Sequence, residues 1–164
     1  WQLHPDPVLE VLTLRADPDA LKSRVEGLID QEMAIYSALG GLIDREAQCV
    51  SDRDMEGLME VLKEKQSYIS RQEELLDLWR EVAVSLGVSG GRESSAFWAA
   101  ISSKVGERGF NDLVLKVNQV RQMAASLLDR EREVQGELES HLSELRAKLI
   151  QMRNGRQVIR GYGG

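Results

Sequence analysis

The chain has 164 residues, of which 42% are hydrophobic and 29% are charged, and its formal net charge is -6 at pH 7. It holds few prolines and few aromatic residues, which is typical of a helical protein rather than a β-sheet protein. Lys and Arg are interspersed among more numerous Glu and Asp, so the composition argues against a general nucleic-acid binder, which needs a basic surface for phosphates.

No hydrophobic run approaches the roughly 20 residues that cross a bilayer, so we expect no membrane span. The start of the chain contains two prolines and no basic cluster, which is unlike a secretory signal. The single cysteine, Cys49, cannot form a disulfide within the chain, which suits a reducing compartment. Together these features favour a cytoplasmic location.

Residues 1–16 form an apolar segment behind a proline-containing start. Pro5 and Pro7 exclude a continuous helix there. The apolar side chains that follow could form a short helix or an extended arm, and either needs a covering partner. We therefore predict an N-terminal arm, and its partner could be this chain or another.

A first long helix is predicted over about 19–49. Asp17 can cap its first turn, and Pro18 suits the first helical position. Its apolar residues form two adjacent rows, a face wide enough to contact two other helices. We interpret Gly40 and Gly41, inside this helix, as a close helix crossing or a mild bend, because the apolar register continues through them.

Two carboxylates, those of Glu32 and Glu46, occupy nominal core positions of this first helix. A catalytic acid would need a second carboxylate or a nucleophile beside it, and the pattern offers neither. We therefore expect boundary positions whose carboxylates reach water or a base on the next helix, such as Lys65.

A second helix is predicted over about 54–86, after a connection so short that the two helices must run antiparallel. Gly87 provides a left-handed C-cap. Apolar side chains recur every three or four residues, and we expect the first helix to cover this row. The row is Met55, Leu58, Leu62, Lys65, Ile69, Gln72, Leu76, Trp79, Ala83 and Leu86.

After a glycine-rich loop, a short helix is predicted over about 95–105, and the sequence GERG interrupts it. A last long helix should cover about 111–153. Asn154 and Gly155 are expected to end it, which leaves residues 154–164 as a flexible C-terminal tail.

The fold class follows from these elements. We predict an all-α protein, an extended antiparallel helical bundle or coiled coil of three long helices plus a short helix, with the bundle spanning 17–153. The apolar row of the last helix gains one residue between Leu138 and Leu142, a stutter that locally unwinds a coiled coil. Beyond this stutter we expect the last helix to outrun the first two.

No catalytic or metal-binding constellation is visible. The only histidines, His4 and His141, lie on different elements, and Cys49 has no second cysteine near it. Trp79 and Trp98 could line a groove, but aromatic residues on a helical seam more often belong to the core. We therefore expect no enzyme, no cofactor and no metal, and we interpret the chain as a binding protein.

A family pattern is visible from Glu32 to Gly87. A first helix ends in leucines and an acidic residue, a short turn contains an aspartate, and a second helix carries Lys and Arg at set places before Leu-Gly. The matching residues are Leu39, Leu42, Ile43, Glu46, Asp54, Leu58, Leu62, Lys65, Ile69, Glu73, Leu76, Arg80, Leu86 and Gly87. The pattern resembles the FlgN-like flagellar export chaperones. Weaker similarities are Asn118, with Arg121 where the family has a second asparagine, and Tyr162-Gly163.

The resemblance implies a function. The chain would bind the C-terminal amphipathic helices of hook-filament junction proteins and deliver them to the type III export gate, with Tyr162 docking on the gate. The client would lie on the apolar row of the last helix. The candidate client-binding residues are Leu138, Leu142, Leu145, Leu149 and Met152. The same row could instead be intramolecular core or a homodimer seam, so a structural coiled-coil protein that only self-associates is the alternative.

Overall fold

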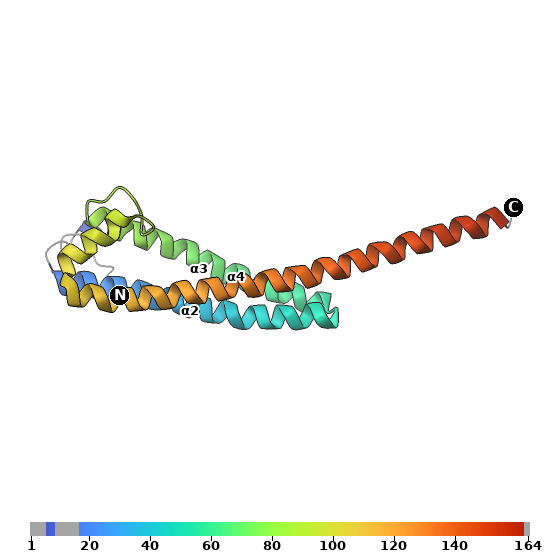
Figure 1. Ribbon diagram of the computed structural model, residues 1–164, viewed down its shortest axis with the longest axis horizontal. Helices are drawn as coiled ribbons and strands as arrows, with labels where there is room; N and C mark the ends of the chain where they lie inside the picture. The colour runs from blue at the N-terminus through green and yellow to red at the C-terminus, as the bar shows by residue number, and fades with distance from the viewer. Residues whose placement is uncertain (1–5, 9–16, 163–164) are drawn as a thin grey trace.

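The computed structural model describes residues 6–8 and 17–162, with side chains through residue 156. The predicted arm at residues 1–16 lies almost entirely outside this part and stays a prediction. The long helices α2, α3 and α4 organise the described residues, among which there is no strand, so the all-α class is confirmed. Figure 1 shows an elongated molecule in which α4 extends far beyond the other two helices.

Helix α2 spans Pro18–Asp52 and begins as predicted. The Asp17 side chain accepts a hydrogen bond from the backbone N–H of Asp19 at 2.9 Å, and Pro18 takes the first helical position. The helix runs past its predicted end at residue 49 and stops at Arg53, which is left-handed with φ 57 and ψ 33. This conformation is unfavourable for a residue with a Cβ, and it turns the chain back at once.

Helix α3, Met55–Ser85, follows directly. The side chain of Asp54 caps it by accepting a hydrogen bond from the Gly57 N–H at 3.0 Å. Beyond its C-terminal end, Gly87 has a φ of 70 and takes the left-handed position predicted for it. Helices α2 and α3 therefore form the expected antiparallel pair.

Helix α4, Ser95–Tyr162, differs from the prediction of a short helix followed by a separate long one. Gly106, with φ 79 and ψ 171, is its one non-helical residue, and the chain changes direction there (Figure 1). The predicted interruption was too long, because only this glycine adopts a conformation that side chains disfavour.

The C-terminal end of α4 also corrects the prediction. The helix does not stop at Arg153 but continues through Asn154 and Gly155 to Tyr162, so residues 154–162 are helical rather than a separate tail. A glycine costs an exposed helix only about 1 kcal/mol relative to alanine. That cost is too small to end a helix whose neighbouring residues, such as Arg156, favour it.

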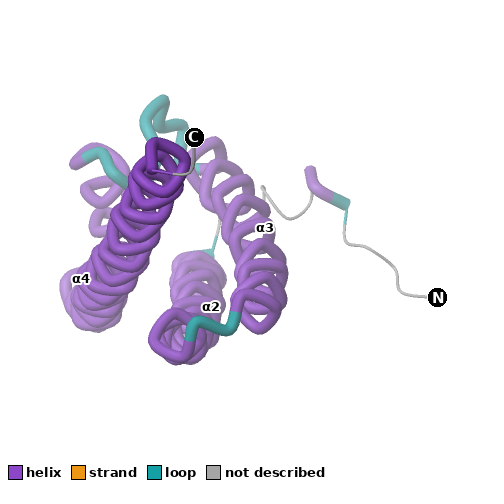
Figure 2. Tube along the Cα trace, turned by 90° about the vertical axis from the view of Figure 1, so that its right-hand side faces the viewer, coloured by secondary structure: helices purple, strands orange, loops and turns teal. Residues whose placement is uncertain are grey.

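Helix α2 is the centre of the packing. Helices α3 and α4 both lie against it, whereas α3 and α4 approach each other far less (Figure 2). The wide apolar face predicted for the first helix thus serves two neighbours. The main core joins all three helices through Leu21, Val25, Leu28 and Ile29 of α2, Val61, Leu75 and Val82 of α3, and Phe97, Ile101 and Leu113 of α4.

The apolar row predicted for α3 is only partly covered by its neighbours. Its members Leu58, Trp79 and Ala83 are buried, but Met55, Leu62, Ile69 and Leu76 are exposed. The other buried apolar positions are Val61, Leu75 and Val82, next to the predicted ones. Because α3 packs mainly on one helix, its buried face is narrower than that of a helix with two neighbours. At several positions the buried residue is the one just before the predicted residue, as with Val61 in place of Leu62.

Gly40 lies at a close crossing of α2 and α4, which is one of the two interpretations given above for Gly40 and Gly41. A Cβ added there would come within 3.2 Å of Arg130 Nη1 and 3.5 Å of Leu127 Cδ2. The Arg130 guanidinium donates to the Gly40 carbonyl at 2.8 Å and also pairs with Asp44. A small residue at this position lets the two helices approach.

Candidate partner-binding surface

The bundle ends where the turn between α2 and α3 reaches α4. Arg53, in that turn, donates to Glu144 of α4, with 3.0 Å between Nη2 and Oε2. Beyond this pair α4 continues without α2 or α3 beside it (Figure 1). The expectation that the last helix outruns the others is therefore met.

Leu138, the first of the predicted client-binding residues, belongs to the bundle. It packs, partly buried, against a second small core cluster made by Ile43, Val50, Leu58 and Val134. A partner could reach it only at its open side. The structure therefore separates Leu138 from the four residues that follow it in the predicted set.

Those four residues form an apolar stripe, by which we mean Leu142, Leu145, Leu149 and Met152. Their exposed fractions are 45%, 54%, 56% and 56%. The spacing of three and four residues places them on one side of α4. Exposed leucines scattered singly are ordinary, whereas these four form a contiguous row on an unsupported part of the helix.

The protruding part of α4 also exposes Ile150, at 59%, which the sequence reasoning did not single out. It follows Leu149 directly and so lies on a neighbouring face of the helix, outside the stripe. The adjacent apolar residues Leu149 and Ile150 in the sequence could have indicated that Ile150 is exposed as well. Tyr162 is the last helical residue of the described part, but its side chain lies outside it, so its predicted docking role stays a prediction.

A second feature lies between the helices, where Lys65 of α3 joins both neighbours. Its Nζ is 2.7 Å from Glu46 Oε2 on α2 and also pairs with Glu131 on α4. Burial lowers the pKa of Lys65, but the hydrogen bonds and charges of Glu131 and Glu46 outweigh it and raise that pKa. The expectation that Glu46 reaches Lys65 is confirmed.

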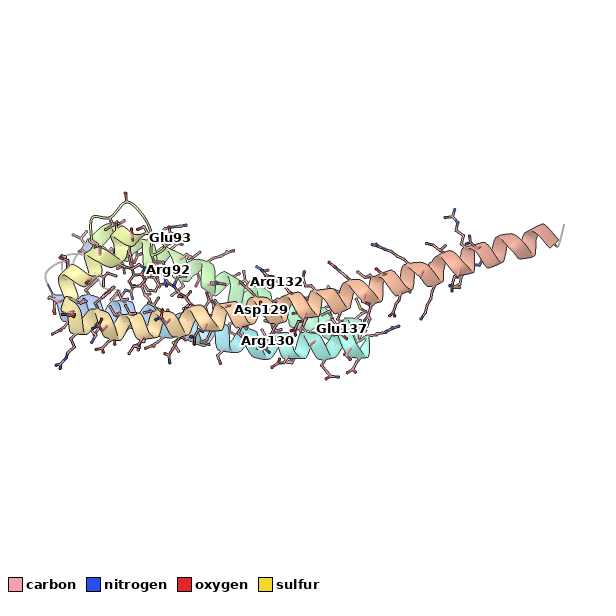
Figure 3. All side chains as sticks on the ribbon, viewed as in Figure 1. Arg92, Glu93, Asp129, Arg130, Arg132 and Glu137 are labelled. Carbon is pink, nitrogen blue, oxygen red and sulfur yellow. The ribbon has the colours of Figure 1, made fainter. Side chains whose placement is uncertain are left out.

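Glu32, the other core carboxylate of α2, finds a base that the sequence did not indicate. Arg92, which Figure 3 labels in the loop before α4, makes a bidentate pair with it. The distance between Arg92 Nη2 and Glu32 Oε1 is 2.8 Å. The Tyr36 hydroxyl donates to Glu32 Oε1 at 2.8 Å. Burial and the adjacent Glu32 charge raise the pKa of Tyr36 to about 12, so it stays protonated.

The Glu32–Arg92 pair borders a cavity of 440 Å³ between α2, α3 and α4. Trp79 and Trp98 line it, and with Phe97 they form an aromatic cluster with ring centroids 5.1 to 6.3 Å apart. Arg92 lies 5.0 Å over the Trp79 ring. The core role is confirmed for Trp79, whereas Trp98 is partly buried against the core, and both rings also line the cavity. The Glu32–Arg92 pair connects the loop before α4 to α2.

No group of three or more His, Cys, Asp or Glu side chains that could hold a metal occurs in the residues searched, 6–8 and 17–162. Cys49 is half-buried and packs between the two core clusters. In the same described ranges, none of the helices has the length and apolar character to cross a membrane.

Comparison with known proteins assigns the chain to a family. A family model described as FlgN protein matches residues 21–163, nearly its whole length and all three long helices. No curated protein and no solved structure matches it. The match supports the resemblance seen between Glu32 and Gly87 and extends it over the protruding helix. The chain belongs to the FlgN family of flagellar export chaperones.

Proposed function

We propose that this chain binds the C-terminal amphipathic helix of a hook-filament junction protein in the cytoplasm and delivers that protein to the flagellar export gate. The observation that carries the proposal is the apolar stripe on the protruding part of α4. An amphipathic helix that is disordered when free can bury its apolar face against such a row and become ordered. The client is thereby kept from assembling before export.

The stripe has the dimensions of one helix–helix contact. Leu142, Leu145, Leu149 and Met152 cover three successive turns, because α4 rises about 1.5 Å per residue and completes a turn every 3.6 residues. Burying one such side chain completely is worth about 1.5–3 kcal/mol in transfer free energy. A few leucines are therefore enough to hold a client helix reversibly after the cost of ordering it.

The test compares two double variants, each of which introduces two aspartates, one on the stripe and the other on the bundle. Leu145→Asp with Leu149→Asp should abolish binding of a junction-protein C-terminal peptide in calorimetry, and circular dichroism should show an intact bundle. The control is Val84→Asp with Leu115→Asp, which changes two apolar residues that are somewhat more exposed but lie on the bundle. Unchanged affinity in the first variant would contradict the proposal.

The role of Tyr162 is tested separately. Tyr162→Ala should keep the affinity for the client peptide and reduce export of the client in cells, because gate docking would be lost while the stripe is intact. Equal export by the variant and the wild type would show that Tyr162 is an ordinary residue near the chain end.

A further inference from the structure

The charged side chains that flank the apolar stripe are all basic. Treating Leu142 and Leu149 as one seam position of a heptad and Leu145 and Met152 as the other, the flanking positions hold Arg146 and Arg153 on one side and Lys148 on the opposite side. All three are exposed, and none has an ion-pair partner within the described residues.

This basic segment is a local exception in an acidic chain. From Leu145 to Arg156 the sequence contains Arg146, Lys148, Arg153 and Arg156 and no acidic residue, although the whole chain has a net charge of -6. Several cations of the bundle pair with acidic residues, among them Arg53 with Glu144 at its tip. Within the described residues, the cations of the protruding segment do not.

The charges of the side chains on either side of the stripe determine which helix can pair with it. In a pair of helices packed along heptad seams, the residues flanking one seam lie next to those flanking the other and set partner choice and orientation. A second copy of this segment would place Arg and Lys against Arg and Lys, whether the copies ran parallel or antiparallel. Such like-charge contacts disfavour self-association and select a different partner.

A membrane surface fits the stripe less well. A helix that lies on a bilayer uses a broad apolar face. Here Arg146 and Arg153 lie between the stripe and Ile150 when the positions are spaced at 100° per residue, so the apolar surface is divided. A stripe with two apolar positions per heptad matches the seam of one partner helix.

We propose that the partner of the stripe is an amphipathic helix whose apolar seam is flanked by acidic side chains, which pair with Arg146, Arg153 and Lys148. This inference rests on the proposed function, because it names the chemistry of the helix that the stripe receives. Charge pairing at the flanks gives the chaperone a means of choosing its client among many helices with similar leucine seams.

The experiment uses the full chain and two synthetic helical peptides of equal length with identical apolar seams. One peptide has glutamate at every flanking position and the other has lysine. The glutamate peptide should bind at least tenfold more tightly at low salt, and its advantage should shrink as salt screens the charges. Arg146→Glu with Arg153→Glu should remove or invert the preference. Arg80→Glu with Arg132→Glu, an equal charge change on the bundle, should leave it unchanged.

Several outcomes would overturn the inference. These are equal affinity for the two peptides, no binding of either, or tighter binding to vesicles of phosphatidylglycerol and phosphatidylcholine than to the glutamate peptide. A wild-type dimer in sedimentation that Leu145→Asp dissociates would also overturn it, since the stripe would then accept its own copy.

The same variants separate this inference from the proposed function. If a junction-protein helix binds the wild type and Arg146→Glu with Arg153→Glu with equal affinity, the function stands and the charge inference is wrong. If the glutamate peptide binds as expected but no junction-protein helix does, the charge inference stands and the function is wrong.

Discussion

The Nζ of Lys65 lies 2.7 Å from Oε2 of Glu46, and this contact connects α3 to a carboxylate that is almost fully buried on α2. Glu131 of α4 pairs with the same ammonium, so one cation serves all three helices. Together with the contacts of Trp79 with Phe97 and Trp98, this triad links α3 to α4, whose backbones lie close to each other at few places.

Replacing Lys65 by methionine should destabilise the fold by about 3 kcal/mol, because Glu46 would remain as an uncompensated buried charge. For a chain of this size the Tm should fall by roughly 6–12 °C in a thermal melt. Lys63→Met, an exposed change on the same helix, is the matched control and should leave the Tm within a degree or two. Equal melting of both variants would show that the triad contributes nothing.

The same contact predicts a pH dependence. The partners of Lys65 raise its pKa in the folded state, so its stabilising contribution is complete below the unfolded pKa of about 10.4. It is lost as pH rises through the higher folded value. The difference in unfolding free energy between the wild type and Lys65→Met should therefore be constant near neutral pH and shrink at strongly alkaline pH. A difference that grows with alkaline pH would contradict this assignment.

The two adjacent glycines of α2 should respond differently to alanine. Gly41 is exposed, and a Cβ added there meets nothing within 4 Å, so Gly41→Ala should stabilise the helix by about 1 kcal/mol. Gly40→Ala should gain less, because its Cβ approaches Arg130 to 3.2 Å. Urea midpoints for the two variants measure the difference, and an equal gain would mean that the crossing is not tight.

Phe97 should be the most sensitive aromatic residue. It is fully buried between Trp79 and Trp98, so Phe97→Ala should cost about 3–5 kcal/mol. Tryptophan fluorescence should move to longer wavelength as solvent reaches the cluster. Phe110→Ala, at a half-buried site packed on the same core, should cost clearly less.

The protruding helix should be dispensable for folding. Truncation after Glu144 keeps Leu138 and the Arg53 pair, and it removes only residues beyond the tip of the bundle. The Tm should stay within about 2 °C of the wild type, since no core residue is lost. Client binding should disappear. A large fall in Tm would show that the removed residues pack on the bundle.

Features set by local chemistry were predictable from the sequence. Asp17-Pro18, Asp54 and Gly87 mark helix ends through hydrogen bonds and backbone angles that involve only neighbouring residues. Asn154-Gly155 is also a local signal, but its cost of about 1 kcal/mol is too small to end α4, which continues to Tyr162. The exposure of the stripe was predictable from its spacing and its position past the stutter, but Leu138 of the same predicted set packs on the bundle. The binding of a client there stays a prediction.

Features set by distant contacts were not predictable. The buried stripe of α3 shifted from Leu62 to Val61 because its position depends on which helix lies opposite. The partner of Glu32 is Arg92, sixty residues away in a loop with no periodic pattern. No spacing rule connects such residues, so the pair becomes visible only when the chain is folded.

The continuity of α4 has a consequence for the energetics of capture. A free helix must first form a nucleus at high entropic cost, and short segments hold little helix in water. Here the backbone ladder passes unbroken from the bundle into residues 145–162, and the packed Leu138 and the paired Glu144 hold its last supported turn. The exposed segment therefore only has to propagate a helix that already exists. Its surface is preorganised, so in the proposed capture of a client helix the entropy loss would fall mainly on the incoming chain.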